Sequence, residues 1–152
     1  MTSSPLEATD RQILQLLGAD GRMSFTDLGK ATGLSTSAVH QRVKRLEQRK
    51  LILGYGATVN HDEIGLPLTA FISIRPIDPS QPDDSPAQLE GIPEIESCWS
   101  VAGDESYILK IRIARPSDLE GLLARIRAAA NVSTRTTIVL STYYENRPVT
   151  GG

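Results

Sequence analysis

The chain lacks the features that mark secreted, disulfide-rich and membrane-spanning proteins. Its 152 residues include a single cysteine, Cys98, and only 5% aromatic residues. One cysteine excludes a disulfide framework and cannot supply a cysteine-rich metal site. No apolar run approaches the ~18 residues of a membrane span, and the first residues lack the pattern of a secretory leader. We therefore expect a cytoplasmic protein with no membrane partner, no metal and no bound cofactor.

Patterns typical of catalysis are also scarce. His40 and His61 stand alone, and Asp83-Asp84 lie in a proline-rich stretch where solvation is the simpler interpretation. Gly54-Tyr55-Gly56 lacks the third glycine and the strand-then-helix context of a dinucleotide site. Neither a phosphate-binding loop nor a nucleophile elbow occurs. The sequence therefore does not predict an enzyme, and we expect Cys98 to pack within a strand rather than react.

The charge is distributed unevenly although its total is small. The formal net charge is −2. Residues 1–60 carry eight basic against five acidic side chains, a balance of +3, whereas residues 61–152 carry eight against thirteen, a balance of −5. A mildly basic module is thus joined to an acidic one, so the net charge is no argument against a nucleic-acid partner.

Helical spacing dominates the first part of the chain. The apolar positions of the first predicted helix are Leu6, Ile13, Leu14 and Leu17. Gly18 and Gly21 should close this helix. Ser24 should cap a second helix that Gly33 ends, and Ser35 should cap a third that runs to about Lys50. We predict a helix-turn-helix domain over residues 1–50.

A mixed pattern follows this domain. We predict a short strand at Leu51–Val59 and assign residues 51–67 to a wing and linker. Further strands are predicted at Leu68–Arg75, Ile95–Val101, Tyr107–Ile113 and Thr134–Tyr144, with a short helix near Pro86–Gly91 and a longer one capped by Ser117. The order β-α-β-β-α-β predicts a ferredoxin-like α/β sandwich over residues 68–152. The fold class is therefore α+β.

The third predicted helix has two distinct faces. Val39, Val43 and Leu46 form its apolar stripe, whereas small polar residues and amides occur early on the other side and cations occur later. A recognition helix has this arrangement, because its early residues reach base edges and its later cations meet phosphates. A solvated surface is the simpler interpretation, but the three-helix context and the Gly33 turn favour DNA.

We predict that eight residues contact DNA. They are Ser35, Thr36, Ser37, His40, Gln41, Lys44, Arg45 and Arg49. Ser35 also marks a helix N-terminus that can accept a phosphate. Arg42 flanks the apolar stripe, where it can instead pair with an acid of the same chain such as Asp27.

Two stretches with specific motifs cover nearly the whole chain. The first contains Asp20-Gly21-Arg22, Gly33-Leu34-Ser35, Arg42-Val43-Lys44-Arg45-Leu46-Glu47 and Ile52-Leu53-Gly54-Tyr55, and the second contains Val101-Ala102-Gly103-Asp104-Glu105-Ser106-Tyr107. Residues 6–60 resemble the winged helix-turn-helix domain of the Lrp/AsnC, or feast/famine, regulators, and residues 68–147 resemble the effector domain of that family. The resemblance implies a transcriptional regulator of amino-acid-related metabolism that binds double-stranded DNA and an amino-acid effector.

The resemblance also implies where the effector binds and how the chain assembles. Effector-binding residues would be Gly103, Asp104, Glu105, Ser106, Tyr107, Thr134 and Thr136, at subunit interfaces. An acid would meet the ammonium group of the amino acid, and a threonine its carboxylate or side chain. An ordinary hairpin turn with solvated acids is the alternative, because Gly-Asp is a common turn signal. The family implies a homodimer that assembles to tetramers or octamers.

Two positions depart from the family pattern. Arg49-Lys50 stands where a glycine usually precedes the wing, so either the turn differs or a cation is added there. Ser106 stands where the family commonly has an aspartate, and a hydroxyl brings no charge to an ammonium group. Two other functions therefore stay open at this point: a sensor subunit of an amino-acid-binding enzyme, and a DNA-compacting protein that ignores ligands.

Overall fold

The chain folds into two compact units. The computed structural model describes residues 5–151. One unit comprises the chain up to Thr58 together with the chain from Tyr143 onward, and the other comprises Val59–Thr142. The second unit is therefore shorter than the predicted 68–152 domain at its C-terminal end, because the last residues pack with the helices. Within residues 5–151, no helix is long and apolar enough to cross a membrane.

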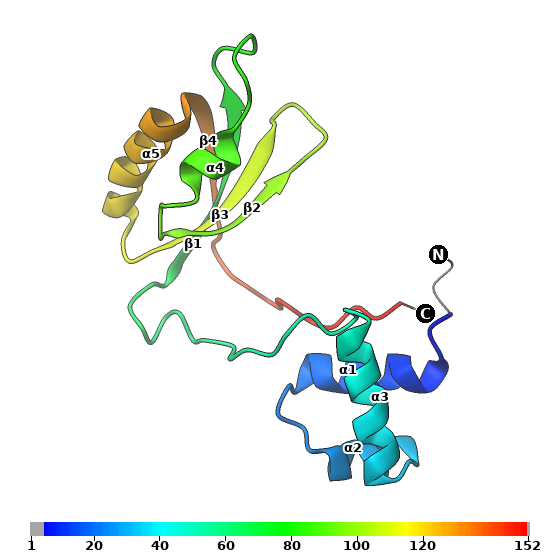
Figure 1. Cartoon of the computed structure of the whole chain (residues 1–152). Coiled ribbons are helices and arrows are strands. Elements are labelled where there is room, and N and C mark those ends of the chain that lie inside the picture. Colours follow the sequence, from blue (N-terminus) through cyan, green and yellow to red (C-terminus); the bar gives the residue numbers. More distant parts are fainter. Residues whose placement is uncertain (1–4, 152) are drawn as a thin grey trace. The chain divides into compact units, whose positions relative to one another are not determined.

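Three helices form the first unit: α1 (Ala8–Ala19), α2 (Phe25–Thr32) and α3 (Thr36–Gln48) (Figure 1). Both predicted serine caps are confirmed. The Ser24 hydroxyl accepts a hydrogen bond from the Asp27 amide at 3.0 Å, and the Ser35 hydroxyl accepts one from the Ala38 amide at 3.2 Å. Each satisfies a backbone donor that the helix itself leaves without a partner. Helix α1 continues through Gly18, which does not close it as predicted.

Gly33 makes the turn between α2 and α3. Its φ of 75° lies in the left-handed region, and its amide donates to the Gly29 carbonyl. The next amide, that of Leu34, donates to the same carbonyl at 3.0 Å. Glycine adopts this backbone conformation without the steric cost that a Cβ brings. The turn therefore sets the direction in which α3 leaves α2.

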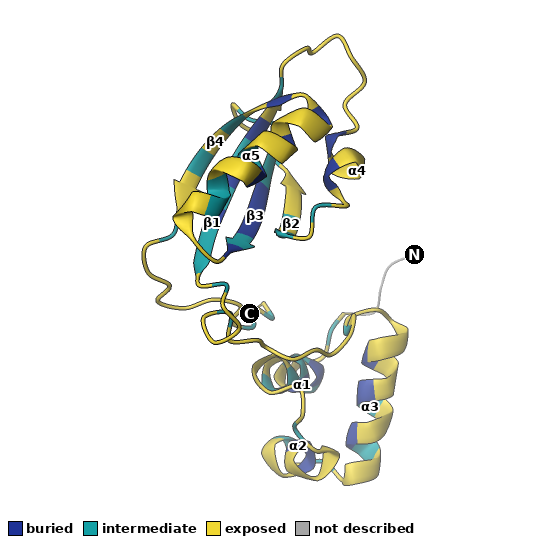
Figure 2. Cartoon of the chain, turned by 90° about the vertical axis from the view of Figure 1, so that its left-hand side faces the viewer, coloured by how far each residue is buried: buried dark blue, intermediate teal, exposed yellow. Residues whose placement is uncertain are grey.

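The helical unit has a small apolar core to which every helix contributes. Ile13 of α1, Leu28 of α2 and Val39, Val43 and Leu46 of α3 are all at most 2% exposed. Figure 2 shows the buried residues of α3 along one side of the helix. The predicted apolar stripe of the third helix is thus confirmed.

The strand predicted at Leu51–Val59 is wrong. This segment has no helix or strand. A strand needs a hydrogen-bonding neighbour, and none of the strand pairs within residues 5–151 involves this segment; two glycines further lower its strand propensity. One side chain still fastens the segment to α3, because the Tyr55 hydroxyl donates to Glu47 Oε1 at 3.0 Å.

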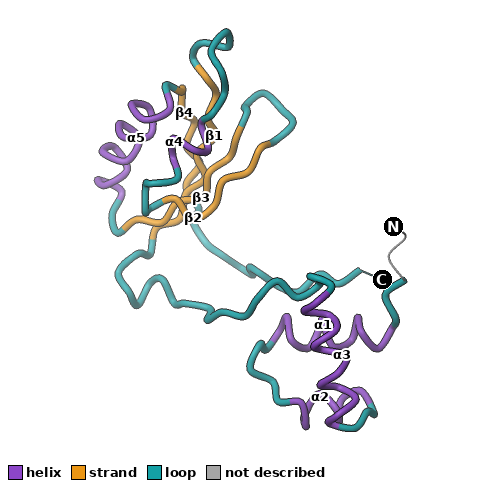
Figure 3. The backbone as a smooth tube through the Cα atoms, in the orientation of Figure 1, coloured by secondary structure: helices purple, strands orange, loops and turns teal. Residues whose placement is uncertain are grey.

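The second unit is a four-stranded sheet with helices on one face (Figure 3). Its elements are β1 (Leu68–Pro76), α4 (Ser85–Leu89), β2 (Ile95–Ser100), β3 (Tyr107–Ile113), α5 (Pro116–Ala130) and β4 (Val132–Ile138). The strand order is β2-β3-β1-β4 and all three pairings are antiparallel. The predicted ferredoxin-like arrangement is confirmed.

The two faces of this sheet differ in burial. Alternate residues of the central strands, such as Ile72 of β1 and Leu109 of β3, are fully buried and cluster with Leu122 and Ile126 of α5. On the other face, Trp99 remains 46% exposed. The helices cover only one side of the sheet, so the other side has no layer of the same unit, residues 59–142, packed over it.

Several predicted details of this unit are wrong. Helix α5 is capped by Arg115, whose amide donates to Asp118 Oδ2 at 3.1 Å, rather than by Ser117. Strand β4 spans Val132–Ile138 instead of the predicted 134–144, and it ends close to the start of its partner β1, since Ile138 pairs with Ala70. Cys98 is exposed instead of packed, because β2 is an edge strand.

Replacing Gly33 by alanine should destabilise the chain by about 1–2 kcal/mol, the cost of placing a Cβ in the left-handed region. The matched control is Gly121→Ala within α5, which has no positive φ. An added Cβ would meet no heavy atom within 4 Å at either site, so only backbone conformation separates them. The control substitution should raise the free energy of unfolding by about 0.5–1 kcal/mol, because alanine is favoured over glycine inside a helix. Urea unfolding measures both, and equal changes would contradict this explanation.

Candidate nucleic-acid interface and effector pocket

Helix α3 presents one polar face to solvent. Its apolar stripe is buried, and all eight residues that we predicted to contact DNA are exposed. They are Ser35, Thr36, Ser37, His40, Gln41, Lys44, Arg45 and Arg49. The structure therefore gathers them on the cap and the outer side of one helix. Small polar groups lie at its N-terminal end and cations at its C-terminal end, the order that suits base edges first and phosphates later.

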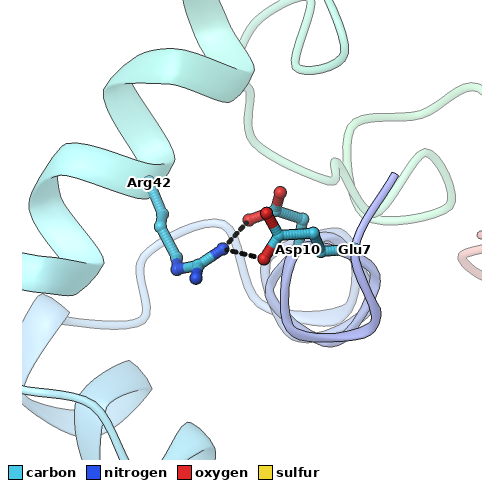
Figure 4. A network of polar contacts seen from close by, with 3 residues as sticks. All are labelled: Glu7, Asp10 and Arg42. Atoms are coloured by element: carbon cyan, nitrogen blue, oxygen red, sulfur yellow. Dashed lines mark hydrogen bonds and ion pairs between the residues drawn. The ribbon is translucent and has the colours of Figure 1, made fainter. Parts of the chain in front are cut away.

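Arg42 is turned inward and joins α3 to α1. Its Nη1 lies 3.0 Å from Glu7 Oε2 and 3.0 Å from Asp10 Oδ1 (Figure 4). These hydrogen bonds to Asp10 and Glu7 raise the pKa of the Arg42 guanidinium. Asp10 is only 5% exposed, so Arg42 supplies a polar partner that solvent does not. The pairing that we considered with Asp27 is not formed, because the acids of α1 hold the guanidinium.

His40 makes a second contact between helices. Its ring lies 5.1 Å from the Phe25 ring, at an interplanar angle of 74°. Phe25 begins α2, so this edge-to-face contact links the start of α2 to the second turn of α3. His40 is exposed as well, which leaves part of the ring open to a ligand.

The structure shows what Arg49-Lys50 does in place of the glycine that usually precedes the wing in this family pattern. Lys50 has a φ of 60°, the left-handed conformation that favours glycine. Its amide donates to the Glu47 carbonyl at 3.0 Å, and the Leu51 amide donates to the Leu46 carbonyl at 2.9 Å. The turn that a glycine would make is therefore kept, and a lysine side chain is added beside the C-terminal end of α3.

A polar pocket lies beside the turn between β2 and β3. Its volume is about 590 Å³. It is lined by the predicted residues Gly103, Asp104, Glu105, Ser106 and Tyr107, together with the proline-rich loop and the end of β1. Thr134 and Thr136 do not line it. The Thr134 hydroxyl instead accepts a hydrogen bond from Arg127 Nη1 at 3.1 Å.

Two charged lining residues were missed by sequence reasoning. Arg75 and Asp83 both border the pocket. Desolvation and a hydrogen bond to Asp83 raise the pKa of Tyr107. The signal for Arg75 was present, since it is the one charge of the strand Leu68–Pro76 and lies near its end. Asp83 gave no such signal, because a loop side chain can approach a strand without any periodic pattern.

The backbone at residue 106 holds the turn in place. The Ser106 amide donates to the Ile74 carbonyl at 3.0 Å, and the Ser106 carbonyl accepts from the Val101 amide at 3.0 Å. These bonds do not involve the side chain. The second departure from the family pattern therefore changes the chemistry of the pocket and not the course of its turn.

A helix-turn-helix unit joined to an α+β unit with a polar pocket is the organisation of a ligand-responsive DNA-binding protein. Family models agree with both halves: residues 6–47 match the AsnC-type helix-turn-helix domain, and residues 69–149 match the Lrp/AsnC ligand binding domain. The chain belongs to the Lrp/AsnC family of transcriptional regulators, and it is not an enzyme.

Individual relatives support this assignment. The chain is 53% identical over 142 residues to the HTH-type transcriptional regulator LrpA of Mycobacterium tuberculosis, covering 93% of this chain and 95% of that protein. It is 34% identical to a leucine-responsive regulatory protein of Haemophilus influenzae, covering 89% and 84% of the two chains. A feast or famine regulatory protein of M. tuberculosis, solved with L-methionine, superposes with a TM-score of 0.93 at 51% identity, covering 97% of this chain and 100% of that one.

Replacing Arg42 by glutamine should destabilise the chain by about 2–3 kcal/mol, because Asp10 would keep a buried charge without its cation. The matched control is Lys44→Gln on the exposed side of the same helix, where surface substitutions change stability by less than about 0.5 kcal/mol. Urea unfolding at neutral pH compares the two. A loss of the same size in both variants would contradict the anchoring role of Arg42.

Proposed function

We propose that this regulator reads specific DNA sequences through the exposed face of α3. The observation that carries the proposal is the division of α3: Val39, Val43, Leu46 and Arg42 are engaged with the other helices, while the amide and cationic side chains project outward. Gln41 would read a base edge, and Lys44 and Arg45 would meet phosphates. A regulator of this kind must have access to DNA, and the cytoplasm remains its expected location.

We further propose that the chain acts as a two-fold dimer or a larger assembly of dimers. A balance of +3 on the first 60 residues is modest, so tight binding would depend on several DNA-binding units acting together. The open face of the sheet supports this assembly, because Trp99 there is 46% exposed. Two related recognition helices would then meet a palindromic site in successive major grooves.

The effector that suits the pocket is a free amino acid. Arg75 would bind the carboxylate of the amino acid, and Asp104 its ammonium group, since both line the pocket. Glu105 is less suited to the ammonium group because Arg135 Nη1 lies 3.5 Å from its Oε1. The methionine complex of the M. tuberculosis relative supports an amino-acid effector. The effector would shift the equilibrium between assembly states by binding one state more tightly than another. The genes controlled would belong to amino-acid metabolism.

Replacing Lys44 by alanine should weaken binding to all DNA. It should also reduce the salt slope, the slope of log affinity against log salt concentration, by roughly one unit, the effect of one lost phosphate contact. The matched variant Gln41→Ala, one turn earlier and uncharged, should leave the salt slope unchanged and alter the ranking of operator sequences. Fluorescence anisotropy over a range of salt concentrations measures both. Unchanged binding and slope in Lys44→Ala would exclude the proposed face.

Calorimetric titration with each of the twenty amino acids should give binding heat for at least one of them. Arg75→Gln should weaken that affinity by about 10- to 100-fold, the contribution of a charged hydrogen bond. Arg115→Gln serves as the control, because this exposed arginine pairs with Asp118 at the start of α5. Sedimentation of the same samples reports the assembly state. No heat and no change in sedimentation with any amino acid would favour a DNA-compacting protein.

A further inference from the structure

The last residues of the chain form an interaction with α1. The chain makes one more hydrogen bond to the sheet just after β4, where the Val139 amide donates to the Thr69 carbonyl at 2.9 Å. The chain then runs as a loop to the helical unit (Figure 3). We call residues 147–151 the C-terminal strap. The guanidinium of Arg147, its first residue, lies 4.0 Å from the centre of the Tyr144 ring and makes a cation–π contact with it.

Three residues of α1 hold the strap. Arg11 Nη1 donates to the Thr150 carbonyl at 2.7 Å, and the Thr150 hydroxyl donates to Gln15 Oε1 at 2.9 Å. Pro148 lies against Gly18. Arg11, Gln15 and Gly18 are spaced four and three residues apart, so they form one face of the helix. Polar bonds and a close apolar contact therefore converge on a single stripe.

Gly18 shows how closely the strap fits. A Cβ built at this position would lie 2.7 Å from Pro148 Cβ, nearer than real Cβ atoms approach other atoms. Gly18 has no positive φ, and α1 would form more readily with alanine there. The backbone conformation of the helix therefore does not require glycine at this position. The close approach of Pro148 does require it, because a side chain would collide with Pro148.

Other sides of α1 face the recognition helix. Asp10 binds Arg42 of α3, and Ile13 is buried in the shared core. Helix α1 is thus in contact with α3 through Asp10 and Ile13, and with the strap through the stripe of Arg11, Gln15 and Gly18. Because α1 contacts both the strap and α3, a structural change at the strap can affect α3 through α1 alone.

We propose that the stripe Arg11, Gln15 and Gly18 is a docking site for the C-terminal strap of the same chain. Docking gives the helical unit a second attachment to the sheet unit, in addition to the linker before β1. A unit that is joined to the rest of the chain by two segments has fewer accessible orientations than a unit joined by one. The strap therefore stabilises α1 and limits how the DNA-binding unit turns.

Four full-length proteins test the docking: the native chain, Gly18→Ala, Pro148→Gly and the double variant. Amide hydrogen exchange reports on α1 without DNA or effector, so its result is independent of the proposed function. In the native background, Gly18→Ala should lower the protection of residues 8–19 by about tenfold, because Pro148 is displaced. In the Pro148→Gly background, the same substitution should leave protection unchanged or raise it. The same loss in both backgrounds would overturn the docking site.

Distances between spin labels test the second attachment. Cys98 is the single cysteine and is exposed in β2, so it serves as one label site, and Thr26→Cys in α2 supplies the other. Labelled chains are diluted with unlabelled ones. Adding Gly18→Ala should broaden the distance distribution, whereas the control Gly121→Ala should leave it unchanged. An identical distribution in the Gly18 variant would show that the strap does not restrict the helical unit.

Discussion

The ion pair between Arg42 and the acids of α1 is the contact on which the DNA-binding surface depends. A helix as short as α3 is marginal alone, so its orientation comes from packing. The stripe of Val39, Val43 and Leu46 fixes which side is buried. Arg42 flanks that stripe and bonds to Asp10 and Glu7, which prevents the helix from rolling about its axis. Gln41, Lys44 and Arg45 face outward as a result.

This anchor also decides which charges remain for DNA. Arg42 is neutralised by two acids of its own unit, so the cations of the outer surface come from the end of α3 and the turn after it. Residues 61–152 carry a balance of −5, which disfavours their contact with phosphates. This distribution of charge supports the proposals that the helical unit binds DNA and that an acid of the other unit binds the ammonium group of the effector.

Local patterns made much of this organisation predictable. Serine caps, the Gly33 turn and the apolar stripe identified α2 and α3, and strand alternation identified the order of the sheet. The outer face of α3 followed from the same 3.6-residue period. These features depend on residues a few positions apart, which is the range over which a single sequence is informative.

Features that depend on distant residues were missed. Asp10 lies in the first turn of α1, and nothing local in the sequence shows that Arg42 reaches it from 32 residues away. Strand β4 ends close to the start of its distant partner β1, and the predicted strand after α3 found no neighbour to pair with. Arg75 became a pocket residue only when the loop after β1 folded beside it. The strap contacts α1 from 139 residues away, the separation of Arg11 and Thr150.

Sequencing the DNA that the protein selects tests the central claim most directly. Sheared genomic DNA is incubated with the full-length chain at moderate salt, and the bound fragments are recovered and sequenced. If the outer face of α3 reads base edges, a limited set of sites should be enriched, and these sites should share half-sites related by a two-fold axis and spaced by about one helical turn or a multiple of it. Uniform recovery across the genome would contradict sequence reading by α3.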